Sequence, residues 1–252
     1  MKGKRGLIIG IANEHSLATG CARALYEAGA ELAVTYLNEK AEPYVRQAVE
    51  AFKPSFILPY DVLSKEDHEN LFKKIKKTWG RLDFIIHSIA YAEQRDLKNP
   101  FHRCSRDGFL EAMEISCYSF VRLAGEAISL MPRGGCLLTM SYLGAERVFP
   151  SYGLMGPVKA ALESSIKYLA AELGPQKIRV LGLSPGPIPT RAARGIPAFE
   201  NLIETARERS PLQEDITIED VGRFAKFLLS SEAKHLTGDT YLIDGGYHIM
   251  GV

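Results

Sequence analysis

Short apolar runs alternate with segments of helical spacing along most of this chain, and this alternation constrains its fold most strongly. Apolar runs of about four to eight residues are typical of buried strands, whereas apolar positions at helical spacing indicate amphipathic helices. Strands that alternate with helices form right-handed βαβ units, so the pattern predicts a parallel sheet with helices on both faces. The expected strands cover residues 6–10, 31–36, 56–59, 82–87, 135–140, 177–183 and 240–244.

Helices are expected between these strands. They cover residues 16–28, 40–52, 65–79 and 105–131, together with a segment that carries Lys159 and runs to about residue 173. No internal repeat, low-complexity tract or linker divides the chain. The sequence therefore predicts one doubly wound, Rossmann-like α/β domain over residues 1–252, with a seven-stranded parallel sheet.

The strand–helix rhythm breaks between residues 184 and 214, which hold five prolines, two or three short amphipathic turns and no expected strand. An insertion of this length within a compact domain is more often a functional lid than a plain connector. We therefore expect a substrate lid over about residues 190–214.

Pro157 complicates the helix that carries Lys159, because proline beyond the first helical turn removes a backbone hydrogen bond. This helix is expected to start after Gly153 or to bend at the proline.

The composition is that of an ordinary globular protein, with 46% hydrophobic and 24% charged residues. The formal net charge of +1 gives no overall electrostatic reason to expect nucleic acid or a membrane as a partner. No apolar run approaches the ~20 residues of a membrane span and no secretory signal is recognised, so a cytoplasmic protein is expected. The cysteines, which show no metal-ligand spacing and are expected as small core residues, are Cys21, Cys104, Cys117 and Cys136. No metal is expected.

The stretch at residues 139–164 concentrates the candidate catalytic side chains. Tyr152 and Lys159 are seven positions apart, which on one α-helix would place both side chains on nearly the same face. A phenol can donate to an oxygen that gains negative charge, and a nearby ammonium lowers the cost of that charge. Tyr142 arrives from the end of the preceding strand. Alternatively, the tyrosines only pack and the lysine is solvated, because this spacing alone is a weak signal.

The turn after the first expected strand, from Gly10 to Gly20, lies where doubly wound domains bind ligands, outside the carboxyl ends of the strands. Its backbone N–H groups and the Ser16 hydroxyl would face a pyrophosphate, and the dipole of the following helix favours an anion. The turn departs from the G-x-G-x-x-G fingerprint, so a purely structural turn is an equal alternative.

Five sequence blocks follow one another with the spacing of a known family. They are Gly-x5-Ser-Leu-Ala-x-Gly at 10–20, His-Ser-Ile-Ala-Tyr-Ala at 87–92, Ser-Tyr-Leu-Gly-Ala-Glu-Arg at 141–147 with Tyr152, Met155 and Lys159 after it, Ser-Pro-Gly-Pro-Ile-Pro-Thr at 184–190, and Thr-Ile-Glu-Asp-Val-Gly at 217–222 with Asp-Gly-Gly at 244–246. Over nearly the whole chain these blocks resemble the enoyl-acyl carrier protein reductases, a branch of the short-chain dehydrogenase/reductases. The Tyr-x6-Lys interval supports this branch, because the wider superfamily normally has Tyr-x3-Lys.

The resemblance implies a dinucleotide cofactor bound along the carboxyl ends of the strands. It places the pyrophosphate and ribose at Gly10, Ile11, Ala12, Ser16 and Leu17, the adenine at Asp61 and Val62, the nicotinamide ribose at Ser88, Ile89, Ala90 and Lys159, and the carboxamide at Ile188 and Thr190. From its position alone, Asp61 is equally expected to cap the helix that starts at Ser64. His87 is expected to be a packed histidine at a strand end.

The segment after the second strand indicates which cofactor is used. A 2′-phosphate is usually met by an arginine or lysine directly at this strand end, and Leu37 and Asn38 are uncharged. NADH is therefore the expected cofactor, with Leu37 beside it, and Lys40 keeps NADPH as the less favoured alternative.

The resemblance also implies the reaction, which is hydride addition to the β-carbon of a trans-2-enoyl thioester in fatty acid biosynthesis. Tyr152 would donate to the thioester oxygen as it gains charge, Lys159 would position the cofactor, and Tyr142 would shape the cavity beside the thioester. The acyl chain would lie against an apolar wall of Tyr91, Ala92, Leu97, Met155, Ile196 and Phe199. Met155 and Phe199 are alternatively plain core residues.

The lid departs from the family pattern. Where the family tends to carry basic residues that meet the acidic carrier protein, Phe199 is flanked by Pro197, Ala198, Glu200 and Asn201. Nearby arginines that could replace the basic patch are Arg191, Arg194, Arg207 and Arg209. Acyl carrier protein is the expected carrier of the substrate, and coenzyme A thioesters remain an alternative.

Two other classes of protein share parts of this pattern. A carbonyl reductase of the same superfamily would have the same fold and cofactor, and a non-catalytic dinucleotide-binding paralogue would keep the cofactor site alone. The block at 141–147 and the seven-residue interval from Tyr152 to Lys159 favour the enoyl reductase over the carbonyl reductase. The joint presence of Tyr152, Lys159 and Thr190 favours it over the non-catalytic protein. The family assembles as homotetramers, so the long helices that start near Ser105 and carry Lys159 are expected to pair across symmetry axes.

Overall fold

The computed structural model, which describes residues 1–251, contains a sheet of seven parallel strands. The strands are β1 (Arg5–Ile9), β2 (Glu31–Tyr36), β3 (Phe56–Pro59), β4 (Phe84–His87), β5 (Gly135–Met140), β6 (Ile178–Pro185) and β7 (Thr240–Ile243). Their order across the sheet is β3-β2-β1-β4-β5-β6-β7, so the strand order reverses between β1 and β4. The predicted doubly wound, Rossmann-like sheet is confirmed.

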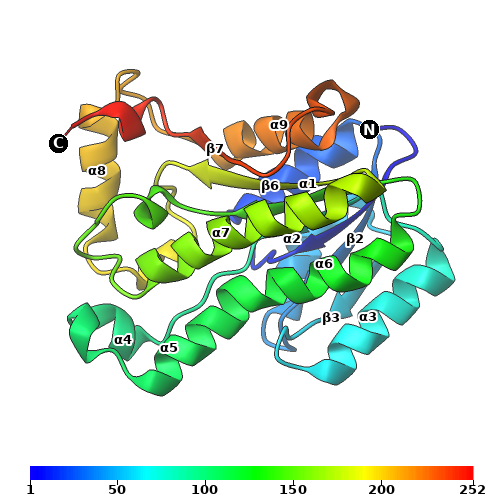
Figure 1. Cartoon of the computed structure of the whole chain (residues 1–252), viewed down its shortest axis with the longest axis horizontal. Coiled ribbons are helices and arrows are strands. Elements are labelled where there is room, and N and C mark those ends of the chain that lie inside the picture. The colour runs from blue at the N-terminus through cyan, green and yellow to red at the C-terminus, as the bar shows by residue number, and fades with distance from the viewer. Residues whose placement is uncertain (252) are drawn as a thin grey trace.

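Helices cover both faces of the sheet (Figure 1). On one face, α1 (Leu17–Glu27), α2 (Glu42–Val49) and α9 (Ile218–Leu229) bury their apolar sides against the strands. On the other face, α3 (Lys65–Thr78), α6 (Ser119–Leu130) and α7 (Met155–Leu173) form a second core. Three further helices, α4 (Gln94–Lys98), α5 (Arg106–Met113) and α8 (Phe199–Arg209), surround the carboxyl ends of the strands.

The block at residues 217–222 determines how α9 begins and how it packs on α1. The Thr217 hydroxyl accepts a hydrogen bond from the Asp220 amide at 3.2 Å, and the Asp220 carboxylate accepts one from the Thr217 amide at 2.9 Å. This reciprocal capping box satisfies two amides at the start of the helix. A Cβ atom at Gly222 would lie 2.2 Å from the Gly20 carbonyl oxygen, so the two helices meet at backbone distance.

The long helix expected over residues 105–131 is interrupted. Between α5 and α6 the segment Glu114–Tyr118 is π-helical. The Ser119 hydroxyl donates to the Ile115 carbonyl at 2.6 Å, and the Ser116 hydroxyl donates to the Tyr91 carbonyl at 3.0 Å. The π-helical turn therefore directs the Ser116 hydroxyl toward the segment that follows β4, and Ser119, which begins α6, lies 2.8 Å from His87 at the end of β4. Apolar periodicity does not predict this interruption.

The helix that carries Lys159 begins at Met155, so the late start expected from Pro157 is the correct alternative. Pro157 is the third residue of α7, where a backbone amide has no partner within the helix. Tyr152 precedes α7 in a turn that contains Gly153 at φ +42°. The expectation that Tyr152 and Lys159 share one helical face is therefore wrong, because the turn and not the helix orients the tyrosine.

The segment at residues 190–214, which we call the lid segment, contains more regular secondary structure than expected. β6 continues through Pro185, so residues 184 and 185 belong to a strand that the sequence did not predict there. In place of short turns only, the lid segment contains the eleven-residue helix α8, which stands at one side of the molecule (Figure 1). The amphipathic pattern of α8 is short and lies between prolines, so it resembles isolated turns in the sequence.

Three of the four cysteines are buried as expected, and Cys104 is only half-buried. No helix in the described part of the chain is long and apolar enough to cross a membrane. Within residues 1–251, no group of three or more histidine, cysteine or acidic side chains is placed to hold a metal ion.

The contact between α1 and α9 can be tested with an alanine at Gly222. Because the new methyl group would overlap the Gly20 carbonyl, we expect Gly222→Ala to lower the free energy of unfolding by about 1–3 kcal/mol. Urea denaturation measures this change. Gly125→Ala in α6 is the matched control, because its Cβ atom would meet nothing within 4 Å, and it should leave stability unchanged or raise it. Equal stability of Gly222→Ala and the parent would contradict this close contact.

Candidate active site

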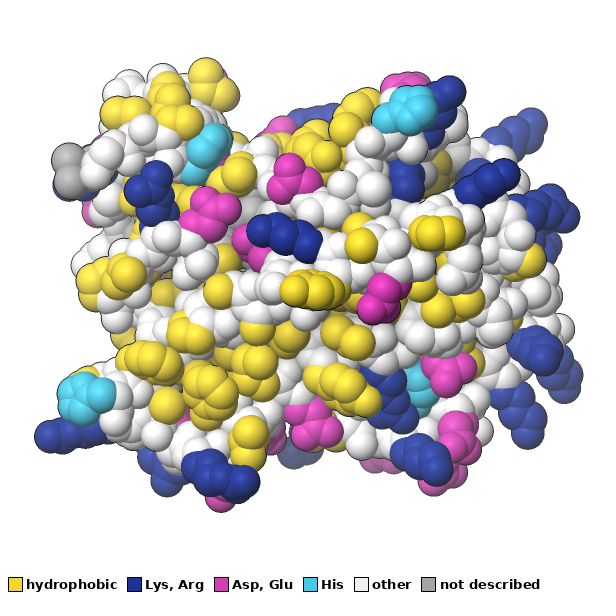
Figure 2. Space-filling view, viewed as in Figure 1, with side chains coloured by type: hydrophobic (Ala, Val, Ile, Leu, Met, Phe, Trp, Pro, Cys, Tyr) yellow, Lys and Arg dark blue, Asp and Glu magenta, His cyan; other side chains and the backbone are white. Residues whose placement is uncertain are grey.

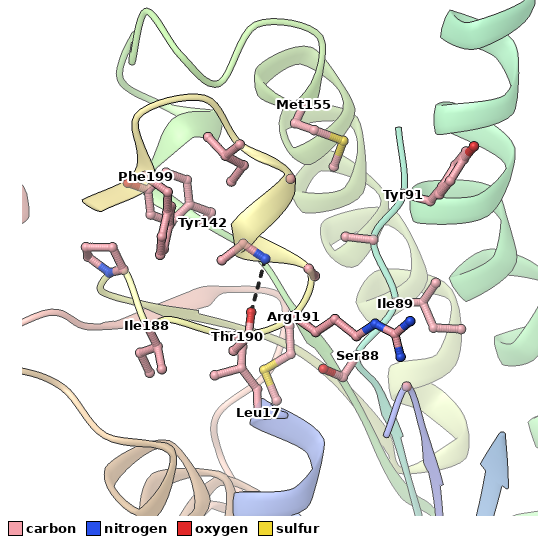
Figure 3. Close-up of a pocket in the computed structure, with 18 of the residues that line it drawn as sticks. Leu17, Ser88, Ile89, Tyr91, Tyr142, Met155, Ile188, Thr190, Arg191 and Phe199 are labelled. Atoms are coloured by element: carbon pink, nitrogen blue, oxygen red, sulfur yellow. Dashed lines mark hydrogen bonds between the residues drawn. The ribbon is translucent and has the colours of Figure 1, made fainter. Parts of the chain in front are cut away.

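A cavity of about 390 Å³ lies at the carboxyl ends of β1, β4, β5 and β6 (Figure 3). This is where doubly wound sheets bind ligands, next to the reversal of strand order between β1 and β4. Its walls come from the first loop, the segments after β4, β5 and β6, the start of α7 and the lid segment. The lining residues are Gly10, Ala12, Ser16, Leu17, Ser88, Ile89, Ala90, Tyr91, Ala92, Gln94, Leu97, Met140, Ser141, Tyr142, Tyr152, Met155, Lys159, Pro185, Gly186, Pro187, Ile188, Thr190, Arg191, Ala192, Ala193, Gly195, Ile196 and Phe199.

The two tyrosines lie against each other in the cavity wall. The ring centroids of Tyr142 and Tyr152 are 4.8 Å apart, and the ring planes are inclined at 58°. Burial raises the pKa of both phenols, so each keeps its proton at neutral pH and is able to donate it in a hydrogen bond. Within residues 1–251, the buried Tyr142 hydroxyl has no hydrogen-bond partner. A buried hydroxyl without a partner indicates a position where a ligand atom would be bound.

Lys159 reaches the same cavity from the first turns of α7, although it is only 4% exposed. Its Nζ atom donates to the Met140 carbonyl at 2.7 Å, at the end of β5. Burial lowers the pKa of Lys159 from 10.5 to about 8, and the Glu163 carboxylate opposes part of this shift. The Glu163 carboxylate in turn accepts a hydrogen bond of 2.5 Å from Ser141. The ammonium is therefore the cationic group deepest in the cavity wall.

A close contact of backbone with side chain fixes the position of Tyr152. A Cβ atom at Gly144 would lie 2.4 Å from Cδ1 of the Tyr152 ring. The glycine of the block at 141–147 therefore leaves the space into which the ring packs. This packing places the phenol at the cavity wall, although Tyr152 lies outside the helix.

The first loop brings backbone into the cavity. Gly10 has φ +104°, and a Cβ atom there would lie 2.0 Å from the Ser88 carbonyl oxygen, so only glycine fits. The Ser16 hydroxyl accepts from the amides of Ala12 and Asn13 at 3.0 and 3.1 Å. Ser16 therefore closes the loop on itself. The amides of Ala12 and Asn13, which lie in the turn predicted to face a pyrophosphate, donate to the Ser16 hydroxyl instead.

His87 is the packed histidine that its position suggested. It is fully buried, and its two ring nitrogens lie 2.8 Å from the hydroxyls of Thr139 and Ser119. Burial lowers the pKa of His87 to about 3, and the Lys159 charge adds to this effect. The ring is therefore neutral at neutral pH and connects β4, β5 and α6 below the cavity.

Four predicted cofactor residues do not line this cavity, and their roles stay predictions. Ile11 is 3% exposed and packs in the core, so its side chain faces away from the cavity. Leu37 is 56% exposed at the end of β2, and Val62 is buried in the core beside α3. Asp61 does not cap α3, because Ser64 is the capping residue and accepts from the Asp67 amide at 3.1 Å. The Asp61 carboxylate instead accepts from the Leu63 amide at 2.9 Å.

The predicted apolar wall is assembled from three separate segments. The segment after β4 contributes Ala92 and Leu97, the start of α7 contributes Met155, and the lid segment contributes Ile196 and Phe199. Figure 3 shows Met155 above the cavity and Phe199 beside Tyr142. Tyr91 also lines the cavity, but it is 43% exposed and its ring points away from the centre (Figure 3).

Sequence reasoning missed several lining residues. Most of them are small or lie on the lid segment, where only the path of the backbone brings them to the cavity; they are Gln94, Met140, Ser141, Pro185, Gly186, Pro187, Arg191, Ala192, Ala193 and Gly195. Of these, Arg191 follows Thr190 directly, so its position beside a predicted cofactor residue was a usable signal. The Thr190 hydroxyl accepts from the Ala193 amide at 3.2 Å and begins a turn of the lid segment (Figure 3).

A doubly wound parallel sheet with a tyrosine and a buried lysine in the cavity at its carboxyl edge is the arrangement expected of a short-chain dehydrogenase/reductase. A family model described as Enoyl-(Acyl carrier protein) reductase matches residues 10–248. The chain belongs to the enoyl-acyl carrier protein reductase family.

Relatives in this family match the full length of the chain. The NADH enoyl-[acyl-carrier-protein] reductase of Aquifex aeolicus is 45% identical and covers 100% of this chain and 94% of its own. The crystal structure of that enzyme superimposes on this chain with a TM-score of 0.96, and the match covers 100% of this chain and 98% of the crystallised one. The enzyme of Anaplasma phagocytophilum in complex with NAD is 44% identical with a TM-score of 0.96, over 100% of this chain and 96% of that one. The Bacillus cereus enzyme with NADP+ and indole naphthyridinone is 43% identical with a TM-score of 0.97, and the match covers 100% of this chain and 98% of that one.

The cost of burying Lys159 can be measured with Lys159→Met. Folding lowers the pKa of this lysine, so between pH 8 and 10.5 the unfolded chain binds more protons and the stability of the parent rises with pH. At pH 7 the variant should therefore have the higher free energy of unfolding. Removal of the buried charge adds up to about 3 kcal/mol, and loss of the hydrogen bond to Met140 subtracts about 1 kcal/mol. This advantage should shrink as the pH rises toward 10.5.

Urea denaturation at pH 7 and pH 10 measures the difference. Lys167→Met, an exposed position on the same helix, is the control and should show no such pH dependence. An advantage of Lys159→Met that stays constant across this range would contradict a buried ammonium.

Proposed function

We propose that this protein is an enoyl-acyl carrier protein reductase whose active site is the cavity at the ends of β1, β4, β5 and β6. It reduces trans-2-enoyl thioesters of acyl carrier protein to saturated acyl thioesters with NADH, a step of fatty acid biosynthesis. The observation that carries the proposal is the pair of inclined rings of Tyr142 and Tyr152, which lines an otherwise apolar cavity beside Lys159.

The residues present fit a dinucleotide. Gly10 has no side chain to collide with the Ser88 carbonyl, so the first loop lies directly against the segment after β4 at the cavity wall. Ser88, Ile89 and Ala90 offer small groups and backbone at the end of β4, and Lys159 provides donors for ribose hydroxyls. Ile188 and Thr190 line the same cavity and would fix the carboxamide. When bound, NADH supplies the hydride that adds to the β-carbon of the substrate.

Hydride addition to the β-carbon moves negative charge to the thioester oxygen, which becomes an enolate oxygen. Tyr152 donates a hydrogen bond to this oxygen, and its raised pKa keeps the proton on the phenol until charge develops. Tyr142 provides a second hydroxyl that has no other partner in the described chain. The Lys159 ammonium makes the local potential positive and orients the cofactor, and the α-carbon is protonated afterwards.

NADH is supported by the end of β2. The Asn38 carboxamide oxygen accepts from the Ala41 amide at 3.1 Å, so it closes the turn. Leu37 is exposed beside it, and neither position offers a positive charge to a 2′-phosphate. The first cationic side chain after this strand is Lys40.

We also propose that the protein acts in the cytoplasm as a homotetramer. Apolar side chains gather over α5, α6 and α7 on the face shown in Figure 2. Leu110 on α5, Tyr118 at the end of the π-helical turn and Tyr168 on α7 are 48%, 55% and 72% exposed. Exposed aromatic residues on neighbouring helices are typical of a surface that another subunit covers.

The role of Tyr152 is tested with Tyr152→Phe. Loss of one preorganised donor should lower kcat about 10²–10³-fold on a short trans-2-enoyl thioester, because such a donor is worth about 3–4 kcal/mol. NADH consumption measures this loss, and the affinity for NADH should not change. Tyr142→Phe is the matched comparison, and a smaller loss is expected because phenylalanine keeps the ring that shapes the cavity and removes only the second hydroxyl.

The same assay, run with the thioester on acyl carrier protein and on coenzyme A, identifies the carrier. Faster turnover on the carrier protein is expected. No turnover on either thioester by a parent that binds NADH would overturn the proposed reaction and favour a carbonyl reductase or a silent dinucleotide-binding protein.

The assembly is tested by sedimentation. The parent should sediment at four times the mass of the 27.9 kDa chain. Tyr168→Asp should lower this mass by placing a charge in a subunit interface, whereas Lys226→Asp on α9 is the control and should not. A monomeric parent would contradict the proposed tetramer.

A further inference from the structure

A second cavity of about 300 Å³ lies beside the first loop and the lid segment. It is lined by Asn13 and His15 of the first loop, Tyr44 of α2, and Pro189, Arg191 and Arg194. The proposed reaction gives no role to Asn13, His15, Tyr44 or Arg194, although Arg194 was expected among the arginines that could meet the carrier protein. The cavity therefore needs an explanation of its own.

The charge of this second cavity is positive and unbalanced. Among the described residues, no acidic side chain lines it and none lines the main cavity. Within residues 1–251, neither Arg191 nor Arg194 forms an ion pair of 4 Å or less, although both are exposed. By contrast, Arg207 on α8 forms two hydrogen bonds with Asp215, at 2.7 and 2.6 Å. The Glu14 carboxylate lies 3.5 Å from His15 and is not part of the lining.

Arg191 connects the two cavities, because it lines both of them. Figure 3 shows its guanidinium extending from the lid segment toward Ser88 and Ile89. The first loop is shared in the same way, since Ala12 and Ser16 line the main cavity and Asn13 lines the second. A ligand that passes along the first loop would therefore meet the arginines on its opposite side.

We propose that the second cavity is a phosphate-binding subsite for the dinucleotide, with Arg191 and Arg194 as its donors. The planar guanidinium forks match the oxygens of a phosphate, and two of them balance its charge where no acidic group competes. This proposal rests on the proposed use of NADH. It makes the lid segment part of the cofactor site as well as of the acyl-chain wall, since Ile196 and Phe199 lie on the same segment.

Two groups of a nicotinamide cofactor offer phosphate oxygens to a guanidinium. The diphosphate is present in both NADH and NADPH, and the 2′-phosphate is present in NADPH alone. The position favours the diphosphate, because the subsite faces the first loop at Asn13 and His15. Leu37, at the usual place of a 2′-phosphate, is not part of the lining.

The experiment measures dissociation constants of NADH and NADPH for the full-length parent, Arg191→Ala, Arg194→Ala and the double variant, without enoyl substrate. Each alanine should weaken binding of both cofactors about tenfold, and Arg194→Lys should recover part of the loss. Arg209→Ala is the matched control, because it removes the same charge from the lid segment without touching either cavity, and its affinity should equal that of the parent.

The two phosphate sources give different results. Equal weakening of NADH and NADPH assigns the diphosphate to the subsite, and weakening of NADPH alone assigns the 2′-phosphate. Unchanged affinities in all arginine variants, or an equal loss in Arg209→Ala, would overturn the subsite. Turnover of the parent on the enoyl thioester is measured separately, so a parent that binds NADH but reduces nothing would refute the reaction and leave the subsite result standing.

Discussion

The parallel pairing of β1 with both β2 and β4 is the constraint on which the rest of this structure depends. The chain winds outward from β1 in two directions, so the loops after β1 and β4 leave a crevice between them. At Gly10 the backbone of the first loop comes so close to Ser88 that no side chain fits between them. This approach joins the two halves of the sheet at the wall of the cavity.

Lys159 shows how stability is given up for function at this opening. The ammonium is almost fully buried and is held by one backbone carbonyl, that of Met140, at 2.7 Å. The lowered pKa expresses the cost of removing that charge from water. The benefit appears only when polar ligand groups occupy the cavity, because the cation and the unpartnered Tyr142 hydroxyl then find partners. An apolar residue in place of Lys159 would pack here at lower cost but would provide no cation.

Glycines and capping residues distant from the chemistry hold this arrangement in place. Gly144 leaves the space for the Tyr152 ring, and the contact of Gly20 with Gly222 brings α9 against α1. The sequence blocks that suggested the family therefore combine two kinds of residue. Some, such as Tyr152, face the cavity, and others, such as Gly222, determine how closely two helices approach.

The sequence by itself determined the parallel sheet, the seven strands and the segments that meet at its carboxyl edge, because local apolar periodicity and the handedness of βαβ units fix these features. It also placed Tyr142, Tyr152 and Lys159 in one stretch and identified His87 as a packed residue. Only the tertiary structure decided that Tyr152 is oriented by a turn before α7, that a π-helical turn divides the helix beside β4, and that Arg191 and Arg194 line a cavity shared with the first loop. These features depend on contacts between segments far apart in the chain, and such contacts leave no periodic trace in the sequence.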